Sequence, residues 1–219
     1  MLTIYGFPTS PYVRKVLLVA QEKGLSYWLI PATPHRPSPP FLAASPFGMM
    51  PAIDDDGFTL ADSSAIAHYF DAKHPAPPLL PRDPQARGRA VMFDEFADTL
   101  LADTARAIGF NRWIGPDLLG IAGDLEAADA AEAKVQPLLD WLEMQVPEEG
   151  WLAGEAFSLA DIAVAACLRT MAYGMDVTTR PRTEDWLARV HSRPAWVAVA
   201  VSEAALVESA RTSGEHRQG

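Results

Sequence analysis

Residues 45–64 read SPFGMMPAIDDDGFTLADSS, and the rest of the chain is organised around this stretch. The pattern predicts a turn, a short apolar strand over residues 52–54, a second strand over residues 58–60 and then the start of a helix. Asp56-Gly57, between the two strands, is a strong hairpin signal. The stretch is therefore expected to form a loop, a hairpin and the first turn of a helix.

Met50-Pro51 lies where the loop enters the first strand, and proline there cannot donate to a ladder. X-Pro bonds are the peptide bonds with a realistic cis form, at about 5–6% of cases in folded proteins. A cis bond would turn the backbone N–H and C=O of Met50 outward, where an extended peptide could pair with them. Asp62-Ser63 would open a helix whose free N–H groups and dipole favour an anion. These features indicate a site for a peptide-like carboxylate, although a plain hairpin and a capped helix would explain them too.

Composition limits the class of protein. The chain has 219 residues, 49% of them hydrophobic and 21% charged, which suits one large domain or two small ones. The formal net charge of −10 argues against nucleic acid as a main partner, because phosphate binding needs clustered Lys and Arg. It still allows an anionic small ligand, because local fields can oppose the overall sign.

The single cysteine and the hydropathy of the chain limit the kinds of site and the cellular compartment that are expected. Cys167 is the single cysteine, so an internal disulfide, a CxxC redox pair and a cysteine-based zinc site are excluded. No metal site is predicted. The first residues do not resemble a signal peptide, and no window of 18 apolar residues predicts a membrane span. A cytoplasmic protein is expected.

The first 74 residues predict the order β-α-β-(short α)-β-β-α. Ser10 is a good N-cap and Pro11 a good first residue for the first helix. A strand, a helix and a strand in succession imply a parallel pair joined by a right-handed crossover. Besides the hairpin, the expected elements are strands over residues 2–5 and 26–30 and helices over residues 11–23, 41–44 and 63–73.

A proline-rich linker over residues 75–84 predicts a domain boundary, and helices alone are expected over residues 85–208. Ser158 and Asp161 form a capping-box pattern before a helix that is apolar nearly all round, which is typical of a core helix. The expected helices run from 84 to about 110, with a break at Gly115-Pro116, from 124 to 145, interrupted or kinked at Pro137, and over 159–173, 183–190 and 195–207. The polar tail over residues 209–219 is expected to fray.

Several segments, in this order and spacing, make the chain resemble a cytosolic glutathione transferase over nearly its whole length. They are GFPTSPYVRKV (6–16), SPFGMMPA (45–52), LADSSAI (60–66), WLAGEAFSLAD (151–161) and SRPA (192–195). The resemblance, closest to serine-type and bacterial-like members, implies a thioredoxin-like N-terminal domain over residues 1–74 and an all-α C-terminal domain over residues 85–208. It also implies a homodimer with a role in detoxification.

By this resemblance, the tripeptide glutathione would bind to the N-terminal domain as a co-substrate. The Met50 backbone would pair with its cysteinyl unit beside Pro51, and Asp62 and Ser63 would hold its γ-glutamyl group. Asp62 suits the ammonium, and Ser63 with nearby N–H groups suits the carboxylate. Helix capping is the alternative role for Asp62 and Ser63.

Ser10 matches the serine that activates the thiolate in the serine-type classes. Lowering a thiol pKa from about 8.5 towards about 6.5 requires roughly 2.7 kcal/mol. A helix N-terminus supplies about 0.3–1 kcal/mol, or up to about 2 kcal/mol when partly buried, and a hydrogen bond to a charged group about 1.5–3 kcal/mol. The two together suffice. Ser10 could instead be a plain N-cap, and the rivals are Thr9, with the same chemistry, and Tyr5, where the tyrosine-type classes place their phenol.

One position departs from the family pattern. The family often has Lys or Arg where Met49 stands, to reach the glycyl carboxylate of glutathione. Met49 cannot form that ion pair, and His35 or Arg36 in the proline-rich loop could replace it.

The second substrate would meet the helical domain. Core packing is the more frequent role for aromatic residues at helical spacing. Arg14 is expected to form a structural ion pair, and Cys167 is expected to be inert. The candidates for the second-substrate pocket are Phe7, Tyr12, Arg106, Phe110 and Trp113.

Two functions follow. The first is a transferase that activates the glutathione thiol for attack on a small electrophile, with isomerase and dehalogenase chemistry as variants. The isomerase variant usually has Ser-Ser-Cys in the first loop and the disulfide-reductase variant has Cys at position 10, whereas this chain has PTSP over residues 8–11. The second function is a non-catalytic binding or regulatory protein of the same fold. Met49 favours the second, and Ser10, Asp62 and Ser63 favour the enzyme.

Overall fold

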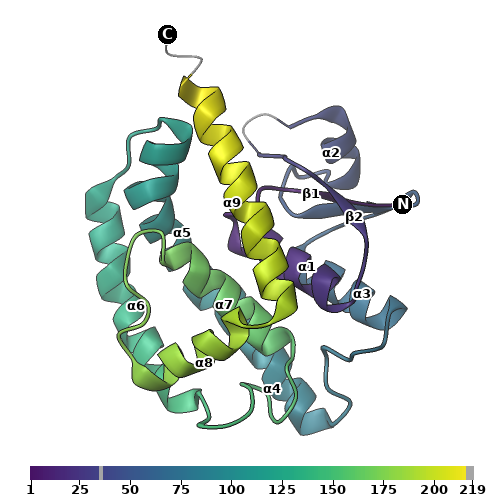
Figure 1. The fold of residues 1–219 in the computed structure, drawn as a ribbon, viewed down its shortest axis with the longest axis vertical. Helices are drawn as coiled ribbons and strands as arrows, with labels where there is room; N and C mark the ends of the chain where they lie inside the picture. Colours follow the sequence, from purple (N-terminus) through teal and green to yellow (C-terminus); the bar gives the residue numbers. More distant parts are fainter. Residues whose placement is uncertain (35–36, 216–219) are drawn as a thin grey trace.

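A four-stranded sheet forms the centre of the N-terminal half of the chain (Figure 1). The computed structural model describes residues 1–34 and 37–215. The strands are β1 (Leu2–Tyr5), β2 (Tyr27–Ile30), β3 (Ala52–Asp55) and β4 (Phe58–Ala61). Their order is β2-β1-β3-β4, with β2 parallel to β1 and with β3 antiparallel to both β1 and β4. The predicted parallel β-α-β unit and the hairpin are both confirmed.

Helices cover both faces of this sheet. They are α1 (Pro11–Glu22), α2 (Pro39–Ala44) and α3 (Ser63–Lys73). Side chains alternate between the faces of a strand, so Ile4 and Ile53 enter the main core with residues of α1 and α3. Tyr5 and Ala52 point to the other face and join a small cluster with Phe41 of α2. The sheet therefore has α1 and α3 on one face and α2 on the other.

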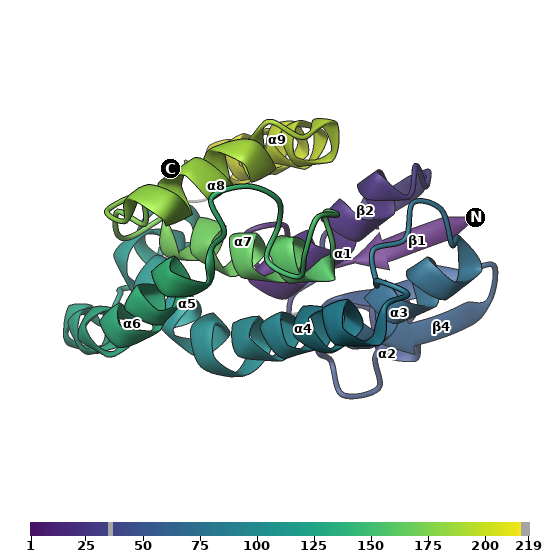
Figure 2. The same cartoon turned by 90° about the horizontal axis from the view of Figure 1, so that it is seen from below.

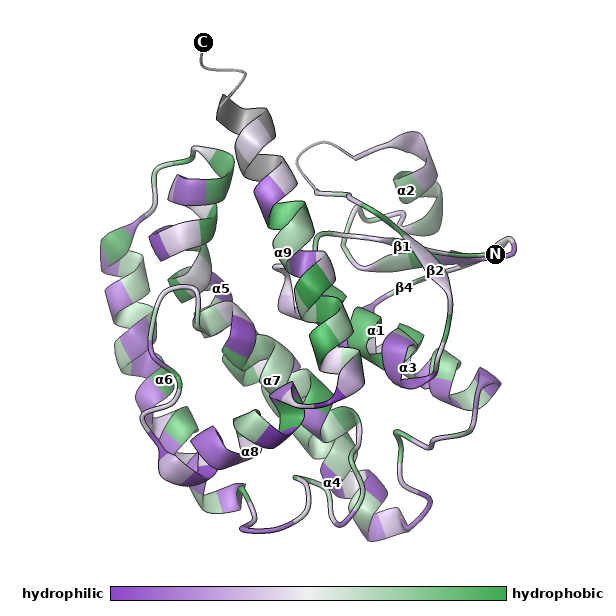
Figure 3. Cartoon of the chain, viewed as in Figure 1, coloured by the Kyte–Doolittle hydropathy of each residue, from purple (hydrophilic) through white to green (hydrophobic). Residues whose placement is uncertain are grey.

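Helices make up most of the second half. They are α4 (Pro84–Glu95), the π-helical η1 (Phe96–Leu101), α5 (Ala102–Gly109), the π-helical η2 (Phe110–Leu119), α6 (Leu125–Gln145), α7 (Leu159–Met171), α8 (Pro181–His191) and α9 (Pro194–Glu215). The capping box predicted from Ser158 and Asp161 is present at the start of α7. α7 lies in the middle, packed against α1, α4 and α5 (Figure 2). Hydrophobic residues dominate α7, whereas α6 alternates between hydrophobic and hydrophilic residues (Figure 3).

The predicted break at Gly115-Pro116 is wrong, because the helix continues through π-helical turns to Leu119. In an α-helix a proline ring clashes with the carbonyl four residues earlier, and the wider turn of a π-helix relieves that clash. The helix instead ends at Gly120, whose φ of 66° lies in the left-handed region that glycine favours. The C=O of Gly115 then accepts the N–H groups of Gly120 and Ile121.

The frayed tail expected over residues 209–219 stays a prediction. Within the described residues, α9 runs from Pro194 to Glu215. Buried Trp196 and Val199 fasten α9 to the core, and it packs along α1. Within its last turns the Thr212 hydroxyl lies 3.1 Å from the C=O groups of Glu208 and Ser209. These local bonds satisfy the hydroxyl without interrupting the helix. The alternative of an interruption at Pro137 is wrong as well, since α6 is continuous there.

The segment between α3 and α4 contains neither helix nor strand, but it is fastened to the core. The Asp71 carboxylate accepts the N–H of Leu79 at 2.8 Å and that of Leu80 at 3.3 Å, and both leucines are buried. The domain boundaries at 1–74, 75–84, 85–208 and 209–219 stay a prediction. Within the described residues, no helix has the length and apolar character needed to cross a membrane.

Candidate functional site

Strand register brings three loops together at one end of the sheet. β1 and β3 pair with Tyr5 opposite Ala52, so the loop after β1 begins beside Pro51. β3 and β4 pair with Ala52 opposite Ala61, so Asp62 begins α3 next to the same proline. The loop after β1, the loop before β3 and the start of α3 therefore form one polar corner.

Ser10 lies at this corner as the N-cap of α1. Its backbone is extended, with φ −70° and ψ 131°, and its C=O accepts the N–H of Arg14 at 2.9 Å. The Ser10 hydroxyl accepts the N–H of Val13 at 3.5 Å, which is longer than the usual range of about 2.7–3.2 Å. The hydroxyl of this half-buried side chain is thus weakly engaged as a cap.

The peptide bond between Met50 and Pro51 is cis. Pro51 is buried, and the backbone N–H and C=O of Met50 have no hydrogen-bond partner among the described residues. The loop before them is fixed by buried Ser45, whose hydroxyl accepts the N–H of Met49 at 3.0 Å and donates to its C=O at 2.7 Å. A rigid loop therefore presents one unpaired backbone donor and acceptor.

Asp62 and Ser63 open α3 at the same corner. Asp62 has φ 82° and ψ 126°, a backbone conformation that non-glycine residues rarely adopt and that often marks a functional site. One Asp62 carboxylate oxygen caps the helix by accepting the N–H of Ala65 at 2.8 Å, while the side chain stays exposed. The Ser63 side chain is 3% exposed, and its hydroxyl has no partner among the described residues.

Lys15 connects α1 to the start of α3 and to the helical half. Its ammonium donates to Ser64 at 3.0 Å, to Asp94 at 2.8 Å and to Asp98 at 2.7 Å, which uses all three of its protons. Burial lowers the pKa of Lys15, but the two carboxylates outweigh burial and raise the pKa above its ordinary value. The side chain is 1% exposed, so this cluster is a buried and fully paired charge network.

Tyr12 stands on the first turn of α1 and donates its hydroxyl to the C=O of Asp98 at 3.3 Å. Burial, together with the nearby Asp98 carboxylate, raises the pKa of Tyr12 to about 12. The phenol therefore stays protonated at neutral pH and acts as a hydrogen-bond donor rather than as a base.

The rivals of Ser10 are less accessible. Thr9 is 6% exposed, and its C=O accepts the hydroxyl of Thr170 at 2.9 Å. Tyr5 is also 6% exposed. Its ring packs against Phe41 on the α2 face, with centroids 6.1 Å apart. Of the three hydroxyls, that of Ser10 belongs to the most accessible side chain.

The candidates for the second-substrate pocket differ in their exposure and contacts. Arg106 is 72% exposed and pairs with Asp103 on its own helix at 3.5 Å. Trp113 stacks on Tyr173 with centroids 4.6 Å apart, so one of its faces is already occupied. Phe7 and Phe110 are half-buried. Tyr12 and Arg106 lie close enough for the Arg106 charge to act on the Tyr12 phenol. The grouping of all five residues into one pocket stays a prediction.

Residue 49, where the family often has Lys or Arg, carries no charge in this chain. The Met49 side chain is 63% exposed and apolar. His35 and Arg36 lie outside the described residues. Across the described ranges, 1–34 and 37–215, no group of three or more His, Cys, Asp or Glu side chains is arranged to hold a metal ion.

The predicted structural ion pair of Arg14 is confirmed, and the burial of Cys167 agrees with its expected inertness. Arg14 forms a buried ion pair with Glu203 at 2.7 Å, as a structural residue would. The Cys167 thiol is 1% exposed and donates to the C=O of Ala97 at 3.4 Å. Burial raises the pKa of Cys167 to about 12, which disfavours the reactive thiolate.

Sequence reasoning did not single out the buried partners of Arg14 and Lys15. The available signal was a pair of adjacent cations in a helix that is otherwise apolar on its buried face, together with Asp94 and Asp98 at i,i+4 spacing. The overlooked residues are Lys15, Asp94, Asp98, Thr170 and Glu203.

The fold and its polar corner define a class of protein, a thioredoxin-like domain joined to an all-helical domain. The sequence-family model of the glutathione S-transferase N-terminal domain matches residues 4–78. The family model of the C-terminal domain matches residues 96–194. The chain belongs to the glutathione S-transferase family.

Relatives and solved structures agree with this assignment. Glutathione S-transferase 3 of Zea mays is 32% identical over 205 residues, which cover 89% of this chain and 91% of that protein. The structure of a glutathione S-transferase III in apo form superposes with a TM-score of 0.80 at 30% identity, covering 91% of this chain and 95% of that one. A theta class glutathione S-transferase from Xanthomonas axonopodis pv. citri, solved with glutathione bound, gives a TM-score of 0.78 at 25% identity. The match covers 89% of this chain and 94% of that one.

Proposed function

We propose that this protein is a glutathione transferase in which Ser10 stabilises the glutathione thiolate for attack on a small electrophile. The observation that carries the proposal is the polar corner, where a weakly engaged hydroxyl, an unpaired backbone segment and a helix N-terminus meet. Each of these groups lacks a full set of partners within the described chain, and a bound tripeptide would complete them.

The tripeptide would bind in an extended conformation across this corner. The Met50 backbone would pair with the cysteinyl unit, as in β-strand addition. The γ-glutamyl carboxylate would meet the Ser63 hydroxyl and the free N–H groups of α3, which favour an anion. The Asp62 carboxylate oxygen that does not cap α3 would accept the γ-glutamyl ammonium.

Activation of the thiol then falls to Ser10. The hydroxyl would donate a hydrogen bond to the sulfur and favour the thiolate, while the thiol proton leaves to solvent. Arg14 and Lys15 follow closely in α1, but Glu203, Asp94 and Asp98 neutralise them. Their field at the sulfur is thus largely cancelled, and the hydroxyl with the α1 N-terminus supplies the stabilisation.

The thiolate would attack an electrophilic carbon and form a C–S bond, with the displaced electrons leaving on a leaving group or on the acceptor. Phe7 and Tyr12 flank Ser10 in the chain and would line the start of the second-substrate pocket, with Phe110 and Trp113 further along it. Isomerase or dehalogenase chemistry would use the same thiolate. A role in detoxification follows from this reactivity, and a cytoplasmic location stays a prediction.

A homodimer is part of the same proposal. Large apolar side chains exposed in the described chain include Phe47 at 91%, Met92 at 45% and Leu100 at 49%, and contact with a second copy would cover such residues. Sedimentation equilibrium would give twice the chain mass, and a monomer at micromolar concentration would contradict this part.

The test of the site is a titration of the thiol of bound glutathione. Calorimetry with millimolar glutathione should first give heat of binding. Thiolate absorbance against pH should then give a lowered thiol pKa, and Ser10→Ala should raise that pKa by more than about one unit, since one unit corresponds to about 1.4 kcal/mol. Thr9→Ala and Tyr5→Phe are the matched controls. If the thiol pKa rises in Thr9→Ala or Tyr5→Phe and not in Ser10→Ala, then Ser10 is not the residue that activates the thiol.

A further inference from the structure

The carbonyl just before Ser10 is held by a residue of the helical half. The Thr170 hydroxyl, on α7, donates to the C=O of Thr9 at 2.9 Å. Thr170 is 2% exposed and Thr9 is 6% exposed, so water does not compete for this bond. The Thr9–Ser10 peptide is thereby tied to α7, although the two segments are 161 positions apart in the chain.

The direction of this hydroxyl is not set by Thr170 alone. A threonine inside a helix commonly donates back to the C=O four residues earlier, which here belongs to Ala166, at 3.4 Å. Arg14 disfavours that choice. Its Nη1 donates to the C=O of Ala166 at 3.0 Å and to Oγ1 of Thr170 at 2.8 Å. Arg14 therefore occupies the competing carbonyl and leaves the single Thr170 proton for Thr9.

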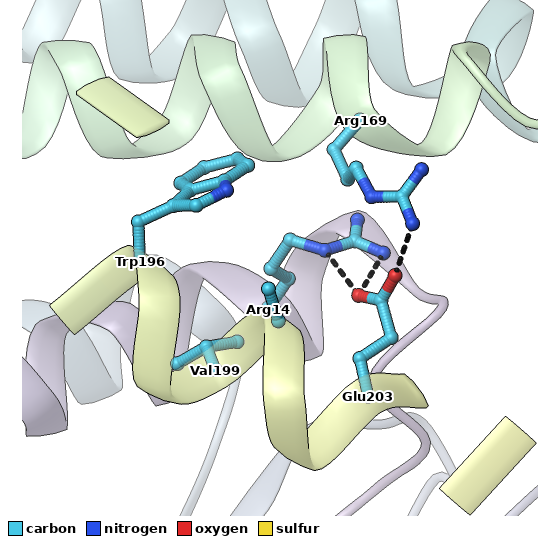
Figure 4. Close-up of a pocket in the computed structure, with 6 residues that line it drawn as sticks. Arg14, Arg169, Trp196, Val199 and Glu203 are labelled. Carbon is cyan, nitrogen blue, oxygen red and sulfur yellow. Dashed lines mark hydrogen bonds and ion pairs between the residues drawn. The ribbon is translucent and has the colours of Figure 1, made fainter. Parts of the chain in front are cut away.

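Arg14 is in turn oriented by α9. Glu203 accepts the Nε of Arg14 at 2.9 Å and its Nη2 at 2.7 Å through one carboxylate oxygen. The other oxygen accepts Arg169 at 2.9 Å and the Tyr173 hydroxyl. Figure 4 shows Glu203 reaching from α9 to Arg14, with Arg169 approaching from α7.

This ion pair is held in a nearly dry environment. Arg14 and Glu203 are 1% and 3% exposed, and the cavity beside them, lined also by Trp196 and Val199, measures about 10 Å³, about the space of one water molecule. Hydrogen bonds in such surroundings are strong and polarise one another. A change at Glu203 would therefore reach the Thr170 hydroxyl.

We propose that Glu203, Arg14 and Thr170 form a positioning relay through which α9 fixes the Thr9–Ser10 peptide and thereby aims the Ser10 hydroxyl at the sulfur of glutathione. This inference rests on the proposed role of Ser10. All three side chains are buried, so each is proposed as a positioning residue without contact to the substrate. Each orients the next, and Thr170 orients the loop that carries Ser10.

Thr170→Val is the discriminating variant, because it keeps the shape of the side chain and removes the hydroxyl. Thr170→Ser, which keeps the hydroxyl, is the matched control. We expect Thr170→Val to raise the pKa of the bound glutathione thiol by about 0.5–1 unit and to lower kcat roughly three- to tenfold. The KM for glutathione should change by less than about twofold, because uniform binding is untouched. Thr170→Ser should restore all these values.

Glu203→Gln tests the other end of the relay. It should shift the thiol pKa in the same direction, and adding it to Thr170→Val should give little further shift, because residues of one relay are not additive. Additive shifts in the two variants would overturn a shared relay. Thr170→Val still tests the proposal if Glu203→Gln does not fold.

Ser10→Ala, measured in parallel, separates the two proposals. An unchanged thiol pKa in Ser10→Ala overturns the proposed function, and the relay with it. A shift in Ser10→Ala with none in a folded Thr170→Val overturns the relay alone. If Thr170→Val lowers the melting temperature but keeps the wild-type thiol pKa and kcat, then Thr170 contributes to packing only and the relay is overturned.

Discussion

Two polar regions of this molecule differ in how completely their groups are paired. At the corner of the sheet, the Met50 backbone and the Ser63 hydroxyl have no partner among the described residues, and the Ser10 hydroxyl makes only one long bond. Between α1 and the helical half, Lys15 and Arg14 have all their close partners supplied by the protein. Since buried polar groups are normally satisfied, we interpret the unpaired groups of the corner as a place for a ligand and the fully paired cluster of Lys15 and Arg14 as structure.

The largest expected effect lies in the paired region. Lys15→Met would leave Asp94 and Asp98 without their cation, and removing one partner of a buried ion pair costs about 3–5 kcal/mol of the free energy of unfolding. Denaturant unfolding would measure it. Lys134→Met, at an exposed position on α6, is the matched control and should change little. If Lys15→Met and Lys134→Met lowered the free energy of unfolding equally, the paired cluster around Lys15 would not be a structural element.

The next effect lies in the unpaired region. Ser63→Ala should weaken glutathione binding about 10- to 100-fold, the value of a hydrogen bond to a charged group, while leaving the free energy of unfolding nearly unchanged. Ser64→Ala is the matched control, because its hydroxyl bonds to Lys15 and Asp98. That change should lower stability and spare binding. Calorimetry and denaturant unfolding on both variants would test this, and the reversed pattern would assign the ligand to the wrong serine.

The smallest expected effect concerns position 49, where Met stands in place of the Lys or Arg that the family often has. Met49→Lys should tighten glutathione binding about two- to fivefold, since exposed ion pairs contribute about 0.2–1 kcal/mol, and the gain should shrink as salt rises. Met49→Gln, which is neutral and of similar length, should show no gain. An affinity that is the same in all three proteins would mean that the glycyl carboxylate does not lie near residue 49.

Much of the fold could be predicted because its signals are local. Ser10 and Pro11 mark the start of α1, and Ser158 with Asp161 marks the start of α7, through bonds that join residues three or four positions apart. The hairpin follows from Asp56-Gly57 in the same way. The end of η2 also has a local signal, the left-handed Gly120, but Gly115-Pro116 gives a competing one, and the sequence does not mark the π-helical turns that carry the helix past the proline.

Sequence by itself therefore determined the order of the elements, their caps and the residue types offered to a peptide-like anion, because these depend on neighbours in the chain. Tertiary structure alone decided that Tyr5 faces α2, that the Ser63 hydroxyl is left unpaired and that Thr170 holds the loop of Ser10. Register and packing settle these choices. A contact such as that of Arg14 with Glu203, 189 positions away, leaves no periodic trace in the sequence.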